Sequence, residues 1–162
     1  MVTVSPPHTW SYALHLPHDP RTPRIARMTL RAVLPAYGMA ELLDTAELLT
    51  SELVTNAYLH TPGPTALRLR ALGAEDAPGV RVSVWDTDPN IPDPFDKPPG
   101  RRGPLSAVPE PAERGRGLLL VRRWADNWGA FPLGDDLFGR GGKLLWFELG
   151  AAPAREALGL SL

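Results

Sequence analysis

The chain has 162 residues, of which 43% are hydrophobic and 22% charged, as expected for one globular domain with a buried core. Its net charge of -1 gives no electrostatic reason to expect direct binding to DNA or RNA. The lack of cysteine excludes disulfides and thiolate metal sites, and no apolar run reaches the ~18 residues of a membrane span. We therefore expect a cytoplasmic protein with no membrane association.

The first predicted elements are a strand and a helix. Residues 10–16 alternate apolar and polar side chains, which is the period of a half-buried strand. Pro23 suits the first turn of a helix, which we expect over residues 24–34 and which Gly38 would end.

Two stripes of side chains follow this predicted helix. The apolar stripe, which we expect to face the core, comprises Ile25, Met28 and Ala32. The basic stripe on the outside comprises Arg24, Arg27 and Arg31. This basic stripe fits a partner-binding surface and an ordinary solvated face equally well.

A second helix is expected where residues 44–47 have the form of a capping box. It continues to about His60, and the Pro-Gly-Pro run in residues 61–64 ends it.

Two alternating runs, residues 65–72 and 80–85, then predict an antiparallel hairpin with its turn at residues 77–79. Residues 88–114 contain eight prolines, and so long a connection is either a functional lid or disordered. The pattern ends with a third helix, expected over about 117–126, and a buried strand over 143–149.

This order of elements predicts an α+β fold, a two-layer sandwich with helices on one face of a mostly antiparallel sheet. We expect a single domain over residues 10–150, preceded by a tail over 1–9 and followed by a tail over 151–162.

The first candidate site is a pair of polar residues on the second predicted helix. Glu52 and Asn56 are four residues apart, so their side chains share one helix face. A carboxylate and an amide oxygen are ligands that magnesium accepts alongside waters and nucleotide phosphates. The same carboxylate could orient or deprotonate an attacking hydroxyl. Taken alone, the pair is more often a solvated polar face.

Asp86 closes the second strand of the predicted hairpin. In a pocket, its carboxylate could accept a hydrogen bond from the exocyclic amine of a base, although an aspartate at a strand end often only begins a turn.

A Gly-x-Gly run leads into the third predicted helix. Glycines allow close backbone approach, and a helix N-terminus offers free N–H groups to anions. Neighbouring arginines could reach the same phosphates. This candidate phosphate cradle comprises Arg114, Gly115, Arg116, Gly117 and Leu118. An ordinary loop-to-helix junction has the same appearance.

Four motifs in this order resemble those of the GHKL ATPases, which share the Bergerat ATP-binding fold. Residues 51–57 (Ser-Glu-Leu-Val-Thr-Asn-Ala) resemble the N box of that superfamily, and 84–86 (Val-Trp-Asp) the start of its first glycine box. Residues 115–120 resemble the second glycine box, and 141–147 the closing strand. The short chain and the sequence before Asn56 look most like the actinobacterial branch related to anti-sigma-factor serine/threonine kinases.

This resemblance implies binding of ATP and magnesium. It implies that Asn56 is the metal ligand, that Glu52 polarises the attacking hydroxyl, and that Asp86 binds the adenine amine. The implied partner is an anti-sigma antagonist that accepts phosphate on a serine, a sigma factor, or both. A homodimer also stays open.

The chain departs from the family pattern in the half of the site that would hold adenine. The first glycine box lacks its glycines over residues 88–90, and Leu144 stands where a threonine is common. Two hypotheses therefore remain: a protein serine kinase, and a non-catalytic module whose partner affinity depends on nucleotide.

Overall fold

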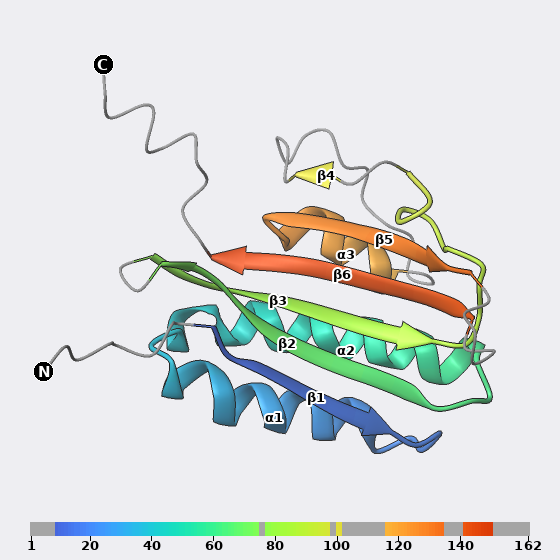
Figure 1. The fold of residues 1–162 in the computed structure, drawn as a ribbon, viewed down its shortest axis with the longest axis horizontal. Coiled ribbons are helices and arrows are strands. Elements are labelled where there is room, and N and C mark those ends of the chain that lie inside the picture. Colours follow the sequence, from blue (N-terminus) through green and yellow to red (C-terminus); the bar gives the residue numbers. More distant parts are fainter. Residues whose placement is uncertain (1–8, 75–76, 98–99, 102–115, 135–140, 151–162) are drawn as a thin grey trace, which may run out of the picture.

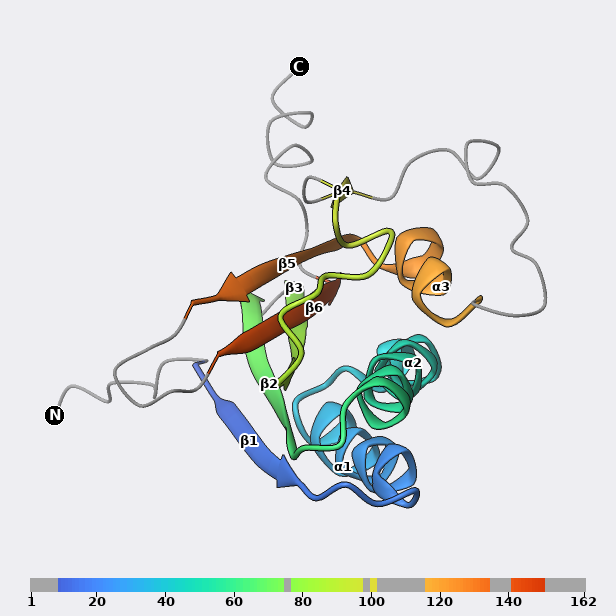
Figure 2. The same cartoon turned by 90° about the vertical axis from the view of Figure 1, so that its right-hand side faces the viewer.

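The computed structural model describes residues 9–74, 77–97, 100–101, 116–134 and 141–150. Within these residues, three α-helices cover one face of an open sheet, as the view along the strands shows (Figure 2). Every strand pair in the described sheet is antiparallel. The predicted α+β two-layer sandwich is therefore confirmed.

The order of the strands across the sheet differs from their order in the sequence, because the last long strand lies inside the sheet. From edge to edge the strands are β1 (Ser11–Leu16), β2 (Thr65–Ala74), β3 (Ala77–Asp86), β6 (Gly142–Gly150), β5 (Asn127–Leu133) and β4 (Gly100–Arg101). The helices are α1 (Thr22–Ala36), α2 (Leu43–His60) and α3 (Arg116–Trp124), and a 3-10 turn, Ala40–Leu42, precedes α2. Both α1 and α2 run along the strands, while α3 lies over the β5 and β6 side (Figure 1).

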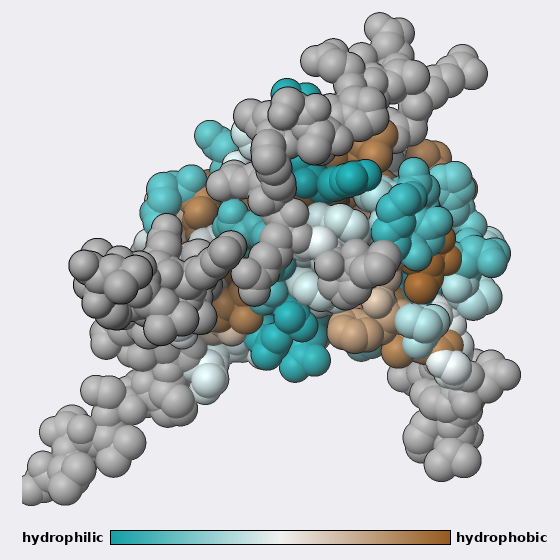
Figure 3. Space-filling view, turned by 90° about the horizontal axis from the view of Figure 1, so that it is seen from above, coloured by the Kyte–Doolittle hydropathy of each residue, from teal (hydrophilic) through white to brown (hydrophobic). Residues whose placement is uncertain are grey.

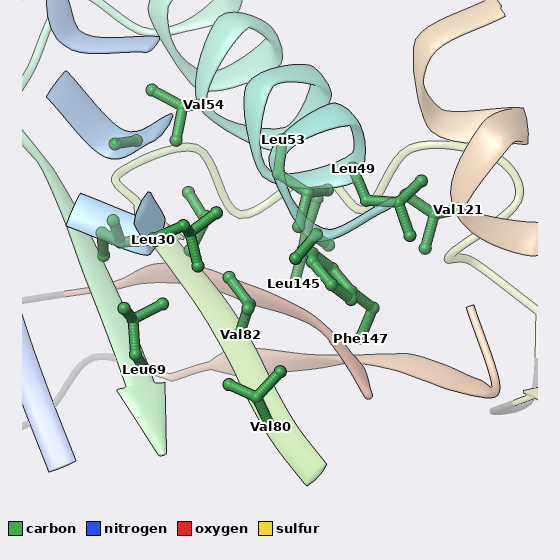
Figure 4. Packing of buried hydrophobic residues seen from close by; sticks show 14 of the residues in the cluster. Leu30, Leu49, Leu53, Val54, Leu69, Val80, Val82, Val121, Leu145 and Phe147 are labelled. Carbon is green, nitrogen blue, oxygen red and sulfur yellow. The ribbon is translucent and has the colours of Figure 1, made fainter. Parts of the chain in front are cut away.

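The core lies between α2 and the central strands. Leu49 and Leu53 point from α2 toward Leu145 and Phe147 of β6 (Figure 4), and all four side chains are buried. Val121 brings α3 into the same cluster. Alternate positions on each strand thus supply the inner face of the sheet, as a period of two requires.

The predicted faces of α1 are wrong, although the helix itself is confirmed. Ile25 and Met28, which we expected in the core, are 45% and 51% exposed. The buried apolar side chains are instead Ala26, Leu30, Val33 and Leu34. Two residues of the basic stripe turn toward α2, where Arg27 donates to the Ser51 hydroxyl at 2.8 Å and Arg31 pairs with Glu47. The third, Arg24, lines a hollow with Ile25 and Met28 instead. Arginine stems can line a helix–helix seam while their charged ends find polar partners there, and the hydropathy pattern alone did not reveal this.

The second helix starts without the predicted capping box. The chain enters α2 directly from the 3-10 turn with Leu42 already in a helical conformation, so no side chain caps the helix. Its predicted end at His60 is confirmed: the backbone N–H and the hydroxyl of Thr61 both bond to the Ala57 carbonyl, at 3.0 Å and 2.8 Å.

The hairpin is confirmed, but its turn is not at residues 77–79. Pro78 and Gly79 pair with Gly73 and Leu72, so the ladder extends to Ala74 opposite Ala77. Proline and glycine usually indicate a turn, yet here they lie at the end of a strand, where pairing with β6 also holds Gly79.

Two strands, β4 and β5, were not predicted. β4 has only two residues, and β5 contains a glycine and a proline that weaken its sequence signal. Gly129 of β5 is required by packing, because a Cβ there would lie 2.6 Å from the Trp146 ring.

The surface seen from the β4 and β5 side mixes hydrophilic and hydrophobic residues (Figure 3). Among the described helices, none has the length and apolar character needed to cross a bilayer.

Candidate functional site

The second half of α2 carries two adjacent faces with different roles. Leu53, Val54 and Ala57 face the core. The neighbouring face lines a pocket with side chains at positions i, i+3, i+4, i+7 and i+8, which are Glu52, Thr55, Asn56, Leu59 and His60. The helix is thereby held rigidly by its apolar face while its polar face stays accessible.

Two other segments complete the pocket. Leu118, in the first turn of α3, closes one side and is 8% exposed. Asp93, from the segment after β3, contributes a second carboxylate. The pocket has a volume of about 360 Å³, which is in the range of small-molecule sites.

The two carboxylates in this pocket have opposite electrostatic surroundings. Burial raises the pKa of Glu52 above its ordinary value, because a partly desolvated carboxylate is less stable in its charged form. A hydrogen bond from Lys97 lowers the pKa of Asp93, which keeps that carboxylate ionised. Of the two carboxylates, Glu52 therefore has the higher proton affinity and is the better proton acceptor.

The chemistry of these side chains fits magnesium with a nucleotide. Among the described residues there is no group of three His, Asp or Glu side chains that could hold a metal by itself. Magnesium in nucleotide sites commonly takes one or two protein oxygens and completes its shell with phosphates and waters. Asn56 and one carboxylate of the pocket match that smaller requirement.

Asp86 lies at the end of β3 and is engaged by a buried lysine. Lys143 Nζ donates to Asp86 Oδ1 at 2.9 Å and to the Asp88 carbonyl at 3.1 Å. The side chains of Asp86 and Lys143 are each 2% exposed. Asp86 Oδ1 also accepts the Asp88 backbone N–H at 2.9 Å, so this oxygen holds two donors.

The register of β6 explains why Lys143 reaches Asp86. The two residues are direct partners in the β3–β6 ladder. Since successive side chains alternate between faces, Leu144 lies on the other face of the sheet, between Trp85 and Phe131. The residue of the closing strand that faces Asp86 is therefore Lys143 and not Leu144, the position that departs from the family pattern.

The structure thus brings only some of the predicted site residues together. Glu52, Asn56 and Leu118 line one pocket, whereas Asp86 is not among the described residues of that lining. Arg116 and Gly117 begin α3, and the predicted phosphate cradle at this helix start stays a prediction. Arg114 and Gly115 lie outside the described residues.

Sequence reasoning missed several residues of the site. Thr55, Leu59 and His60 could have been found from helical spacing relative to Glu52. Asp93 gave no such signal, because the path of the proline-rich segment is not periodic. Lys143 became visible only once the strand register placed it opposite Asp86.

Comparison with known proteins agrees with this arrangement. No curated protein matches the chain. The family model of the histidine kinase-like ATPase domain matches residues 16–132, which include all three helices, the α2 pocket and most of the sheet; β6 and nearly all of β1 lie outside that range. The match spans most of the 162 residues. The chain belongs to the histidine kinase-like ATPase domain family, a group of ATP-binding domains of the GHKL type.

Proposed function

We propose that this protein binds ATP with magnesium in the α2 pocket and transfers the γ-phosphate to a serine of a partner protein. The observation that carries the proposal is the placement of Glu52 and Asn56 together in a pocket closed by Leu118, within an ATPase domain. A carboxylate with a raised pKa beside an amide oxygen that could bind magnesium supports a role in phosphoryl transfer.

In this proposal each residue has one task. Bound magnesium would neutralise charge on the phosphates. Asn56 would hold the metal through its amide oxygen, and Leu118 would keep water from the reacting groups. Glu52 would accept the proton of the serine hydroxyl while the serine oxygen forms a bond to the γ-phosphorus. The bond between that phosphorus and the β–γ bridging oxygen breaks, and ADP leaves.

The partner is proposed from the resemblance to anti-sigma-factor kinases: an antagonist protein that carries the serine, a sigma factor, or both. A surface suited to such a partner lies on α1, where Ile25 and Met28 are exposed and Arg21 and Arg24 stand at the same hollow. Apolar side chains bordered by arginines complement a partner segment whose apolar residues are flanked by acidic ones.

A second candidate is a binding module that senses nucleotide without transferring phosphate. The ion pair between Asp86 and Lys143 favours it, because a carboxylate already neutralised inside the protein is a poor base-recognition group. The two candidates differ in turnover and not in the location of the pocket.

Titration calorimetry and labelled ATP test the proposal. Wild-type protein should bind magnesium-ATP and transfer label from the γ-position to an array of serine peptides. Glu52→Ala should bind but lose transfer at least tenfold, while Glu41→Ala, an exposed glutamate before α2, should behave as wild type. Absence of binding at millimolar ATP would refute nucleotide binding, and binding without transfer would leave the module as the function.

A further inference from the structure

The sheet has a second face, the outer face, which none of the described helices covers (Figure 2). Figure 1 looks directly onto it. Successive residues of a strand point to opposite faces, so the outer face consists of the side chains that alternate with core residues such as Val82 and Leu145. In an open antiparallel sheet this face is usually polar, because it meets water. Here it carries aromatic rings and arginines side by side.

Three aromatic rings lie on the outer face of β3, β6 and β5. The ladders place Trp85 opposite Leu144, and Leu144 opposite Phe131. Trp146 lies flat against β5 because Gly129 has no side chain there, and its ring stacks with that of Phe131, with centroids 6.3 Å apart. Phe131 is 49% exposed and Trp85 is half-buried, whereas Trp146 is buried. Phe131 and Trp85 can therefore meet a ligand, while Trp146 supports Phe131.

Three arginines stand next to these rings on the same face. Arg70 and Arg81 are direct partners in the β2–β3 ladder, although like charges in this position repel. Glu148 lies 3.4 Å from Arg81 and offsets part of that repulsion. Arg70 is exposed and makes no hydrogen bond or ion pair with the part of the chain that the structure describes, and Arg68 is exposed beside it. The net charge of -1 thus conceals a local excess of positive charge.

The combination of rings and cations narrows the chemistry of the ligand. Arginines bind phosphate oxygens, and aromatic side chains stack with planar bases. A single strand of nucleic acid offers both groups in every nucleotide, and a flat sheet with aromatic side chains is a known way to bind it. A duplex keeps its base faces stacked inside the helix, so they cannot reach rings on a sheet surface.

We propose that the outer face of the sheet binds single-stranded nucleic acid, with bases stacked on Phe131 and Trp85 and phosphates held by Arg68 and Arg70. This surface lies across the sheet from the helices and the α2 pocket. The inference therefore does not depend on the proposed binding of ATP. An acidic protein segment is the competing occupant, and the experiment separates the two.

Fluorescence anisotropy of the wild-type protein with labelled oligouridylate and oligothymidylate of about twelve nucleotides tests the proposal. At about 50 mM salt the dissociation constant for at least one of them should be below about 100 µM. Its logarithm should rise with the logarithm of salt concentration with a slope of about 2 or less, as three cations allow. A duplex of the same length should bind at least about tenfold more weakly.

Matched variants place the binding on this face. Phe131→Ala should weaken it about fivefold or more, whereas Tyr37→Ala, which removes an exposed ring beside α1, should have less than about a twofold effect. Arg70→Met should weaken it about threefold or more and lower the salt slope by about 0.7. Arg24→Met removes an exposed cation from α1 instead and should change neither quantity.

Several outcomes would overturn the proposal. They are the absence of binding by both oligonucleotides, equal affinity for the duplex, and equal losses in Phe131→Ala and Tyr37→Ala. Displacement by millimolar magnesium-ATP would assign the binding to the α2 pocket, and displacement by polyglutamate at equal charge concentration would assign the face to an acidic protein. Circular dichroism establishes that each variant is folded. If Phe131→Ala does not fold, Arg70→Met and its control decide.

Discussion

Gly142 lies directly against Asp86: a Cβ added to Gly142 would be 2.0 Å from the Asp86 carbonyl oxygen, and the residue has a φ of +114°. Both features exclude a side chain at this position. β6 can approach β3 closely only because this residue is glycine, and that approach places Lys143 at Asp86.

Gly142→Ala should therefore lower the free energy of unfolding by about 2 kcal/mol or more, since the strained φ and the backbone overlap cannot both be relieved. Urea unfolding measures the change. Gly134→Ala is the matched control, because a Cβ added to Gly134 would meet nothing within 4 Å and its expected effect is within about 0.5 kcal/mol. Equal stability of the two variants would contradict the close apposition.

Lys143→Met should destabilise the fold by about 3 kcal/mol, because it leaves the Asp86 carboxylate buried without its partner. Lys97→Met breaks an ion pair of exposed side chains, with Asp93, and should leave the free energy of unfolding almost unchanged, because solvent screens such a pair. The comparison is made by urea unfolding of both variants at pH 7. Similar small losses would show that the Asp86 pair is solvated.

The orientation of α1 is tested by two truncations on opposite faces. Leu30→Ala removes a fully buried side chain and should cost about 3 kcal/mol. Met28→Ala truncates a side chain that is 51% exposed and should change stability by less than about 0.5 kcal/mol. Thermal unfolding distinguishes them. A larger loss for Met28→Ala would reverse the assigned faces.

The raised pKa of Glu52 predicts the pH dependence of phosphate transfer. Glu52 must be ionised to accept a proton, so transfer should fall as pH decreases through a pKa higher than that of an ordinary glutamate. Binding of magnesium-ATP, followed in parallel, separates loss of the base from loss of nucleotide. An acidic limb at the ordinary glutamate pKa would argue against Glu52 as the base.

The same shift affects stability with a defined sign. Because the folded-state pKa is raised, ionisation of Glu52 opposes folding once the pH rises above the unfolded pKa. Glu52→Gln should thus melt at a higher temperature than wild type at pH 7, and this difference should vanish in acid below the unfolded pKa. A lower melting temperature at pH 7 would mean that the carboxylate makes a stabilising contact.

The amino-acid sequence by itself determined the helices, the strands β1, β2, β3 and β6, and the two-layer class, because these depend on local periodicity. It also determined that Glu52 and Asn56 share a face, since four residues make about one helical turn. Short-range patterns cannot specify what lies opposite a residue. Only the tertiary structure decided that Ile25 and Met28 face solvent, because α2 supplies polar partners for the arginines.

Tertiary structure also decided the composition of the site. Asp93 lies in the same pocket as Glu52, but it comes from a segment without periodicity. Lys143 donates a hydrogen bond to Asp86, which is 57 residues away in the sequence, because the strand register places the two opposite each other. Strand pairing is a long-range relation, and a shift of one residue would have placed Leu144 on the inner face instead. The sequence thus predicted that Glu52 and Asn56 lie together, while the register of β6 determined the surroundings of Asp86.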